Sequence, residues 1–166
     1  MRSPNRVFWS LASVLVLADC SSKRAIESSL PLTGVPSPVI DGVMRFTLAY
    51  NQGGAMSTHL GPYQRWILIG VGIVMLCVLA RWYRRLAHTG HLAVVGLALI
   101  AGGAVGNLLD RVISSRGVVD FIDIGVGANR FYIFNLADVG LSVGAALLAF
   151  ALWRKDRDAS RPELSS

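Results

Sequence analysis

The stretch VLVLADCSSK, Val14-Leu15-Val16-Leu17-Ala18-Asp19-Cys20-Ser21-Ser22-Lys23, ends the first apolar run of the chain and decides how the N-terminal segment folds. A basic start, a short apolar core and a cysteine are typical of a leader peptide whose cysteine becomes lipidated. The same residues also fit a membrane helix that carries an aspartate and a lysine. A lipidation signal needs a small residue directly before its cysteine, and Asp19 occupies that place. We therefore predict that residues 7–23 form a membrane span.

The composition of the whole chain indicates a membrane protein. Of its 166 residues, 53% are hydrophobic and 16% are charged, and the mean hydropathy is +0.52. This leaves too little polar surface to cover a water-soluble globule of this size. Three further apolar segments, residues 66–83, 92–109 and 133–153, come close to the ~20 residues that cross ~30 Å of hydrocarbon. We predict an all-α membrane protein with four transmembrane helices.

The positions of the basic residues predict the orientation in the membrane. The formal net charge is +6, but lysine and arginine do not gather into a patch with exposed aromatic residues, so we expect no nucleic-acid partner. They cluster before the first span, between the second and third, and after the fourth, which places both termini in the cytoplasm. Residues 1–156 then form a single integral membrane domain with outer loops at 24–65 and 110–130. Residues 157–166 form a polar cytoplasmic tail.

This orientation brings unusual polar side chains to one depth near the outer surface. Six of them form three pairs at helical spacing: Asp19 with Lys23, Asn107 with Arg111, and Asn135 with Asp138. Residues three or four positions apart lie on one side of a helix, so each helix has one polar corner. A structural alternative would pair neighbouring charges, Asp19 with Lys23 and Asp110 with Arg111. It leaves Asp138, an ionisable group inside a span, without a cation on its own helix.

Small residues in the last two spans predict close packing. Gly102 and Gly106 lie four residues apart in the third span, and Gly140 and Gly144 repeat this spacing in the fourth. Such spacing lets two helix backbones approach closely. We expect the third and fourth helices to pack on these glycines.

The first outer loop has a pattern of its own. Hydrophobic and polar residues alternate over residues 44–50, which predicts a half-buried strand that ends in a turn at residues 51–54. A second short strand is predicted at residues 117–124. Together they predict a small β-sheet on the outer membrane surface, above the polar corner. The preceding stretch, with Pro31, Pro36 and Pro38, is predicted to be an extended loop.

Five motifs in sequence order resemble those of the bacterial lipoprotein signal peptidases, also called type II signal peptidases. They are Asp19-Cys20-Ser21-Ser22-Lys23, Asn51-Gln52-Gly53-Gly54-Ala55-Met56, Gly102-Gly103-Ala104-Val105-Gly106-Asn107-Leu108-Leu109-Asp110-Arg111, Val118-Val119-Asp120-Phe121 and Phe134-Asn135-Leu136-Ala137-Asp138. Two features depart from the family pattern. Met56 stands where the family usually has an aromatic residue, and the link at residues 112–117 is one residue longer than is typical.

The resemblance implies an aspartic endopeptidase that cuts the signal peptide from a prolipoprotein just before its diacylglyceryl-modified cysteine. It implies that Asp120 and Asp138 are the catalytic pair, and two adjacent carboxylates that share one proton suit this chemistry. The residues that match site-supporting positions of the family are Asp19, Lys23, Asn51, Asn107, Asp110, Arg111 and Asn135. From the residues themselves we expect Arg111, paired with Asp110, to order the loop that carries Asp120. Asp123 competes with Asp120, but on a strand the two point to opposite faces.

The resemblance also implies the setting of the reaction. It implies no metal and no organic cofactor, and it implies partners that are diacylglyceryl-modified prolipoprotein signal peptides and membrane lipid. We expect a monomer in the bacterial cytoplasmic (inner) membrane, with its active site near the outer, periplasmic face. The family's cyclic peptide inhibitor, globomycin, is expected to act on it.

Two non-enzyme classes compete with this interpretation. A small proton-coupled transporter or channel subunit could use Asp138 as its intramembrane carboxylate. Such a protein needs polar residues along a path through the membrane, and neither residues 66–80 of the second span nor the inner half of the third span contains a charged residue. A structural partner of a larger membrane complex would explain the glycines but not the five polar motifs.

Overall fold

The computed structural model describes residues 3–30, 32–53 and 61–159, which form four long helices and a small sheet. In chain order the elements are α1 (Pro4–Ser29), β1 (Pro36–Ile40), β2 (Met44–Asn51), α2 (Gln64–Leu86), α3 (His91–Ile113), β3 (Val118–Val126), β4 (Asn129–Arg130) and α4 (Leu136–Ala159). Gly54 of the predicted turn and Met56 of the second motif lie outside the described residues.

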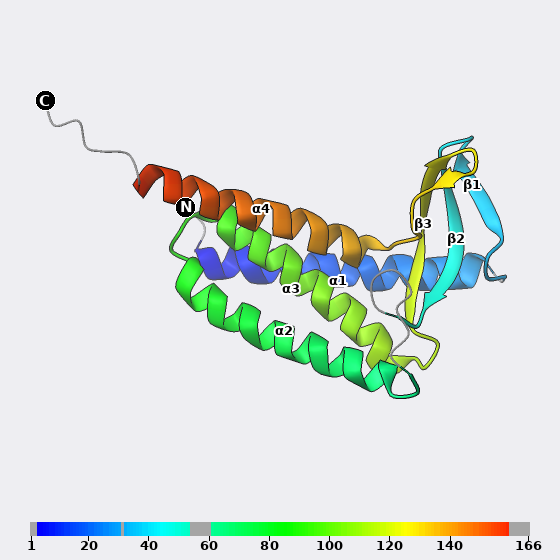
Figure 1. The fold of residues 1–166 in the computed structure, drawn as a ribbon, viewed down its shortest axis with the longest axis horizontal. Helices are drawn as coiled ribbons and strands as arrows, with labels where there is room; N and C mark the ends of the chain where they lie inside the picture. Colours follow the sequence, from blue (N-terminus) through cyan, green and yellow to red (C-terminus); the bar gives the residue numbers. More distant parts are fainter. Residues whose placement is uncertain (1–2, 31, 54–60, 160–166) are drawn as a thin grey trace, which may run out of the picture.

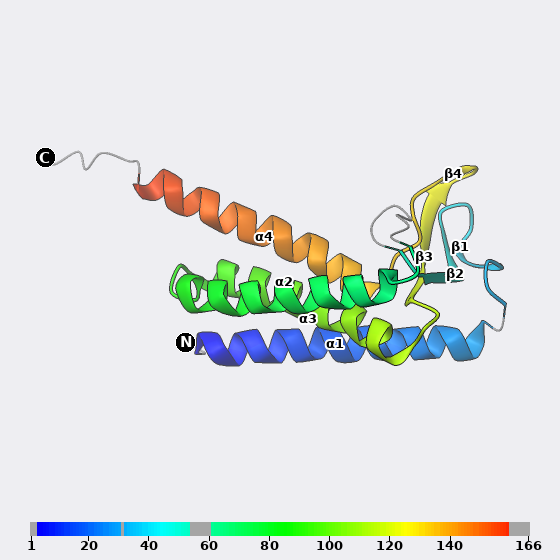
Figure 2. The same ribbon diagram turned by 60° about the horizontal axis from the view of Figure 1, so that its bottom comes forward.

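The four helices run alongside one another, and the sheet lies at one end of the bundle, beside the C-terminal part of α1 (Figures 1 and 2). The start of α1 and the end of α4 lie at the opposite end. The third helix is central, because α3 contacts each of the other three helices. Every loop that carries a predicted site residue is therefore at the end of the bundle with the sheet.

Three helices, α2, α3 and α4, are long and apolar enough to cross a membrane. The first helix is 26 residues long and continues six residues past the predicted end of its span. The last helix begins at Leu136, later than predicted, because the residues before it pair with β3: Phe134 bridges to Ile122. It continues to Ala159, so the first part of the predicted tail is helical.

The glycines of α3 face two different helices, which corrects one prediction. Gly102 was expected against α4, but a side chain there would meet Ala12 of α1. A side chain at Gly106 would meet Asp19 of α1 first and Ala137 of α4 at 3.4 Å, so the expectation holds there in part. The closest contacts with α4 are made by Gly103, whose Cβ would meet the carbonyl oxygen of Ala137, and by Gly96, whose Cβ would lie 2.8 Å from the carbonyl oxygen of Gly144. Gly144 of α4 therefore packs on α3 as predicted. Residues six apart, such as 96 and 102, differ in direction around a helix, which explains how both sides of α3 come to be closely packed.

The sheet has the strand order β1-β2-β3-β4, and all its neighbouring strands are antiparallel. Strands β2 and β3 confirm the two predicted strands. The expected loop before them is wrong in part, since Pro36 and Pro38 lie in β1. This strand has a neighbour on one side only, and an edge is where proline is tolerated because it cannot donate a ladder hydrogen bond. The register places Ala49 opposite Asp120 and Asn51 opposite Val118.

The close α3–α4 contact can be tested with one methyl group. In Gly96→Ala the new Cβ would lie within 3 Å of backbone atoms of Gly144 and Leu148. We expect a loss of about 1–3 kcal/mol in stability, measured as a lower thermal unfolding midpoint in detergent. The matched control is Gly70→Ala in α2, where nothing lies within 4 Å, and where alanine should stabilise the helix. Equal midpoints for the two variants would contradict the close contact.

Candidate active site

The predicted polar residues gather around one buried lysine. Asp19 is fully buried, and Lys23 is 2% exposed. The Nζ atom of Lys23 lies 2.7 Å from Oδ2 of Asp19 and 2.8 Å from Oδ2 of Asp110. It also donates a hydrogen bond of 3.2 Å to Oδ1 of Asn107. One ammonium group of α1 therefore serves two carboxylates and one amide, and it joins α1 to α3.

The expected pair of Asp110 with Arg111 is replaced by a different arrangement. Asp110 pairs with Lys23, and its Oδ2 accepts the N–H of Val119 at 3.2 Å. Arg111 donates to the carbonyl oxygens of Asn107 at 3.1 Å and Gly53 at 3.2 Å. Consecutive helix residues point in different directions, so one of these two side chains turns toward α1 and the other away. Asp110, rather than Arg111, thus contacts the strand that carries Asp120.

The N-terminus of α4 is capped by two of the predicted site residues. Oδ1 of Asn135 accepts the N–H of Asp138 at 2.9 Å, and Oδ2 of Asp138 accepts the N–H of Asn135 at 3.2 Å. This reciprocal arrangement is a capping box, with asparagine and aspartate in its two positions. Oδ1 of Asp19 accepts the N–H of Ala137 at 2.9 Å. The Asn-x-x-Asp spacing of residues 135–138 is the sequence signal of this cap.

Asp120 and Asp138 are held by amide groups, and one of these amides belongs to a residue that contacts both. Asp120 accepts hydrogen bonds from Nδ2 of Asn135 at 2.6 Å and from Nδ2 of Asn51 at 3.1 Å. Asp138 accepts one from Nδ2 of Asn107 at 2.8 Å. Because the backbone N–H of Asn135 also donates to Asp138, the fully buried Asn135 links the two carboxylates.

The surroundings of Asp120 favour its protonated form. Burial, followed by the nearby charge of Asp138, raises the pKa of Asp120 to about 6, against the hydrogen bonds from Asn51 and Asn135 and the charge of Lys23. Two carboxylates at close range resist joint ionisation, so such a pair holds one proton over part of the pH range. The charge of Asp138 thus helps to keep a proton on Asp120.

Asp123 lies on the same strand but has other neighbours. Its carboxylate forms ion pairs with Arg45 and with Arg130, the second at 2.9 Å, and it accepts a hydrogen bond of 3.2 Å from Thr47. Burial alone would raise the pKa of Asp123, but the hydrogen bonds from Arg45, Arg130 and Thr47 outweigh burial and lower it. Asp123 is thus a charged group that ties β2, β3 and β4 together.

Two residues at the start of α2 border the site, and the sequence analysis missed both. The buried Gln64 donates its side-chain amide to the carbonyl oxygen of Gln52. Arg65 donates from Nε to the carbonyl oxygen of Arg111 at 2.7 Å, and from its terminal guanidinium nitrogen to that of Val112 at 3.0 Å. Their one sequence signal was their position directly before an apolar span.

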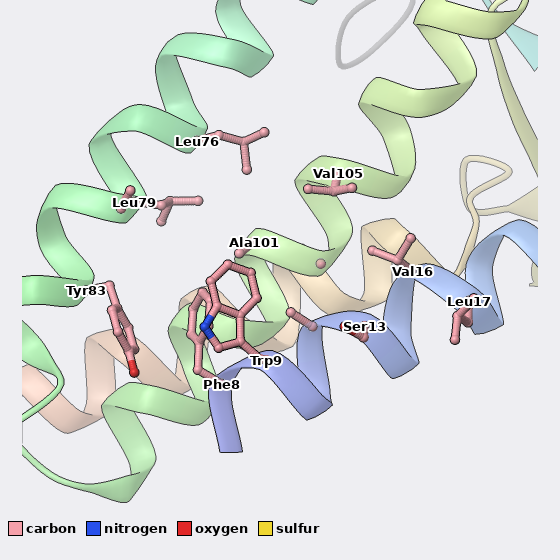
Figure 3. Close-up of a pocket in the computed structure, with 13 residues that line it drawn as sticks. Phe8, Trp9, Ser13, Val16, Leu17, Leu76, Leu79, Tyr83, Ala101 and Val105 are labelled. Atoms are coloured by element: carbon pink, nitrogen blue, oxygen red, sulfur yellow. The ribbon is translucent and has the colours of Figure 1, made fainter. Parts of the chain in front are cut away.

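An apolar groove lies between α1, α2 and α3, apart from these polar groups (Figure 3). Its volume is about 660 Å³, and Phe8, Trp9, Leu76 and Leu79 are among the residues that line it. None of the described residues that line it carries a carboxylate, an ammonium group or a side-chain amide. Among the described residues, no group of three or more His, Cys, Asp or Glu side chains is placed to hold a metal ion.

Two solved structures share this fold. Both are titled as a bacterial membrane enzyme structure obtained by the in meso method. One superposes with a TM-score of 0.83 at 28% identity, over 96% of this chain and 94% of that chain. The other gives a TM-score of 0.77 at 30% identity, over 87% and 91%. The fold and the buried polar cluster thus define an integral membrane enzyme.

Sequence relatives narrow this class. A lipoprotein signal peptidase of Ectopseudomonas mendocina is 41% identical over 91% of this chain and 90% of its own length. A lipoprotein signal peptidase of Hydrogenovibrio crunogenus is 35% identical, over 89% and 86%. The family described as signal peptidase (SPase) II matches residues 11–154, and the chain belongs to this family. The transporter or channel interpretation has no support in these matches.

The buried lysine predicts a large effect of removing its charge. Lys23→Met would leave the carboxylates of Asp19 and Asp110 without their cation. Breaking a buried ion pair in this way costs about 3–5 kcal/mol, so the thermal unfolding midpoint in detergent should fall sharply. The control is Arg24→Met at the next, exposed position of α1. If both variants unfold at the wild-type midpoint, Lys23 does not hold α1 against α3.

Proposed function

We propose that this protein removes signal peptides from prolipoproteins as an aspartic endopeptidase, with Asp120 and Asp138 as its catalytic pair. Membership of the signal peptidase II family, whose relatives are named lipoprotein signal peptidases, supports the reaction and the substrate class. The observation that carries the catalytic assignment is the contact of Asn135 with both carboxylates. This contact supports the assignment of one carboxylate as proton donor and the other as proton acceptor.

The two carboxylates have different roles in this mechanism. Asp120, whose pKa is raised to about 6, holds the shared proton and donates it to the oxygen of the scissile carbonyl. Asp138 lies in the first turn of α4, where a helix N-terminus favours negative charge, and it accepts a proton from the attacking water. The tetrahedral gem-diol intermediate then collapses. Asp138 gives its proton to the leaving amine nitrogen, the carbon–nitrogen bond breaks, and a hydroxyl of the intermediate returns its proton to Asp120 as the carbonyl forms again.

The supporting residues act by position. Asn51 and Asn135 orient the carboxylate of Asp120, and Asn107 orients that of Asp138. Lys23, Asp19 and Asp110 hold α1 against α3, which carries Asn107. Arg111 holds the backbone near Asn51 by its bond to Gly53. No step of this mechanism passes through a metal or an organic cofactor.

The membrane arrangement follows the same proposal. Four helices cross the bacterial cytoplasmic membrane with both termini in the cytoplasm, since α1 runs alongside the three apolar helices (Figure 1). Residues 1–156 act as one domain, and the sheet and the catalytic pair lie at the outer face. Membrane lipid surrounds the spans, and a monomer suffices because the polar cluster is built from one chain. Charge placement gives no reason to invoke a nucleic-acid partner.

Replacing either carboxylate tests the catalytic pair. Asp120→Asn and Asp138→Asn keep the size of the side chain but remove a titratable proton. Each variant should insert and fold yet lose nearly all cleavage of a lipidated prolipoprotein, measured by gel shift with purified protein in detergent. The double variant should be little worse than either single one, because groups that act as a unit do not contribute additively.

The matched control is Asp123→Asn on the same strand. It weakens the ion pairs with Arg45 and Arg130, so stability should fall, but it removes no group from the pair. Substantial cleavage is expected from the folded fraction. Near wild-type cleavage by well-folded Asp138→Asn protein would rule the pair out and move the catalytic role to other residues.

The pH dependence tests which carboxylate holds the proton. Cleavage requires protonated Asp120, so kcat/KM should fall as the pH rises through its pKa of about 6. The hydrogen bond from Asn51 favours the charged form and lowers this pKa. Asn51→Ala should therefore raise the pKa of Asp120 and move the alkaline limb of the kcat/KM profile to higher pH. This shift should be seen even if the variant has a lower maximal rate. A limb that stays in place or moves to lower pH would contradict the assignment.

A further inference from the structure

We infer that a polar cavity at the outer ends of α2 and α3 receives the first residue after the modified cysteine of the substrate. We further infer that Arg65 makes this subsite prefer an acidic side chain to a basic one. This inference rests on the proposed function, because it assumes that Asp120 and Asp138 cut the bond. It assigns a specificity that family membership does not supply.

The cavity is polar and positively charged. Its volume is about 350 Å³, and its lining includes Gln52, Gln64, Arg65, Trp66, Arg111 and Ser115. Two of these residues are arginines, and none of the described lining residues is acidic. A cavity of this kind suits a peptide segment with a polar or anionic side chain.

Arg111 is a wall of a second cavity with the opposite character. This cavity measures about 200 Å³ and lies among α2, α3 and α4, where its lining is mostly aliphatic: Leu68, Val71, Met75, Ala104, Leu108 and Leu141. Asn107 lines it too, and Asn107 donates to Asp138. Along α2, Leu68 lies one turn further into the bundle than Gln64. The apolar cavity therefore lies on the bundle side of Arg111, and the polar cavity lies on the side of the loops.

A prolipoprotein has the same order of polarity along its chain. Its signal peptide is apolar, and the cut falls before the modified cysteine. The mature segment that follows the cut is polar and exposed to water. With the scissile bond beside Asp138, the apolar part fits the cavity among the helices. The residues after the cut then enter the polar cavity. The groove in Figure 3 lacks this connection, because neither Asn107 nor Arg111 lines it.

Arg65 is the fixed charge in this cavity. Its guanidinium is held by the carbonyl oxygens of Arg111 and Val112, and it stacks 5.2 Å from the ring centre of Trp66. Within the described part of the chain Arg65 forms no ion pair. Arg111 differs, because the carboxylates of Asp110, Asp120 and Asp138 act on its charge. Arg65 thus keeps a positive charge that a substrate side chain can meet.

The experiment uses full-length enzyme and three lipidated substrates that differ only in the residue after the modified cysteine, which is Asp, Ser or Lys. For the wild type, kcat/KM should fall about fivefold from Asp to Ser and about fivefold from Ser to Lys. Fivefold is the change in kcat/KM that corresponds to the interaction energy of two unit charges about 4 Å apart in water. Arg65→Gln should bring all three values together, while Arg65→Lys should keep the order. Ratios are taken within each variant, so a smaller folded fraction cancels.

The matched control is Arg24→Gln, which removes one exposed positive charge from α1 and lines neither cavity. It should leave the substrate order unchanged. Equal cleavage of the three substrates by the wild type would overturn the inference and leave the proposed function intact. So would an Arg65→Gln variant that slows all three substrates by the same factor, because Arg65 would then only support the end of α3. Failure of the wild type to cut the Ser substrate would overturn the proposed function and this inference with it.

Discussion

The bridge from Lys23 to Asp19 and Asp110 is the interaction on which the rest of the site depends. Buried charges are tolerated only when they are paired and hydrogen bonded, so this bridge fixes how α1 lies against α3. Each of these two carboxylates also accepts a hydrogen bond from a backbone N–H of another part of the fold. Asp19 accepts the N–H of Ala137 at the start of α4, and Asp110 accepts the N–H of Val119 beside Asp120. One ammonium group thereby sets the positions of the two elements that carry the proposed catalytic pair.

Periodicity and spacing in the sequence predicted which residues converge, because positions on one helix or strand have fixed relative directions. Asp19 and Lys23 share a side of α1, and β2 follows from the alternation of apolar and polar residues over 44–50. Contacts between elements could not be predicted in this way. The bond of Asp110 to Lys23 and the side of α3 on which Gly96 lies depend on the rotation of α3 about its axis. That rotation follows from the packing of all four helices together.

The two aspartates of β3 show how surroundings divide identical side chains between tasks. Asp120 meets neutral amides and another carboxylate, while Asp123 meets two guanidinium groups. A neutral amide orients a carboxylate but carries no charge that would keep the carboxylate ionised. The carboxyl group can therefore still take up and release a proton during a reaction. A guanidinium fixes the charge and turns the carboxylate into a tie between strands. Asp120 and Asp123 are three positions apart on β3, so their side chains point to opposite faces of the strand and meet these different neighbours.

The capping box at the start of α4 joins the proposed catalytic pair to the integrity of a helix end. Asp138 can accept the N–H of Asn135 only while the first turn of α4 is formed, and Asn135 bonds Asp120 from the same position. Helix ends fray more easily than helix centres. On warming, the site should therefore disassemble by loss of this one turn at temperatures where the bundle is still intact. Heat inactivation would then begin as a local and reversible event, ahead of global unfolding.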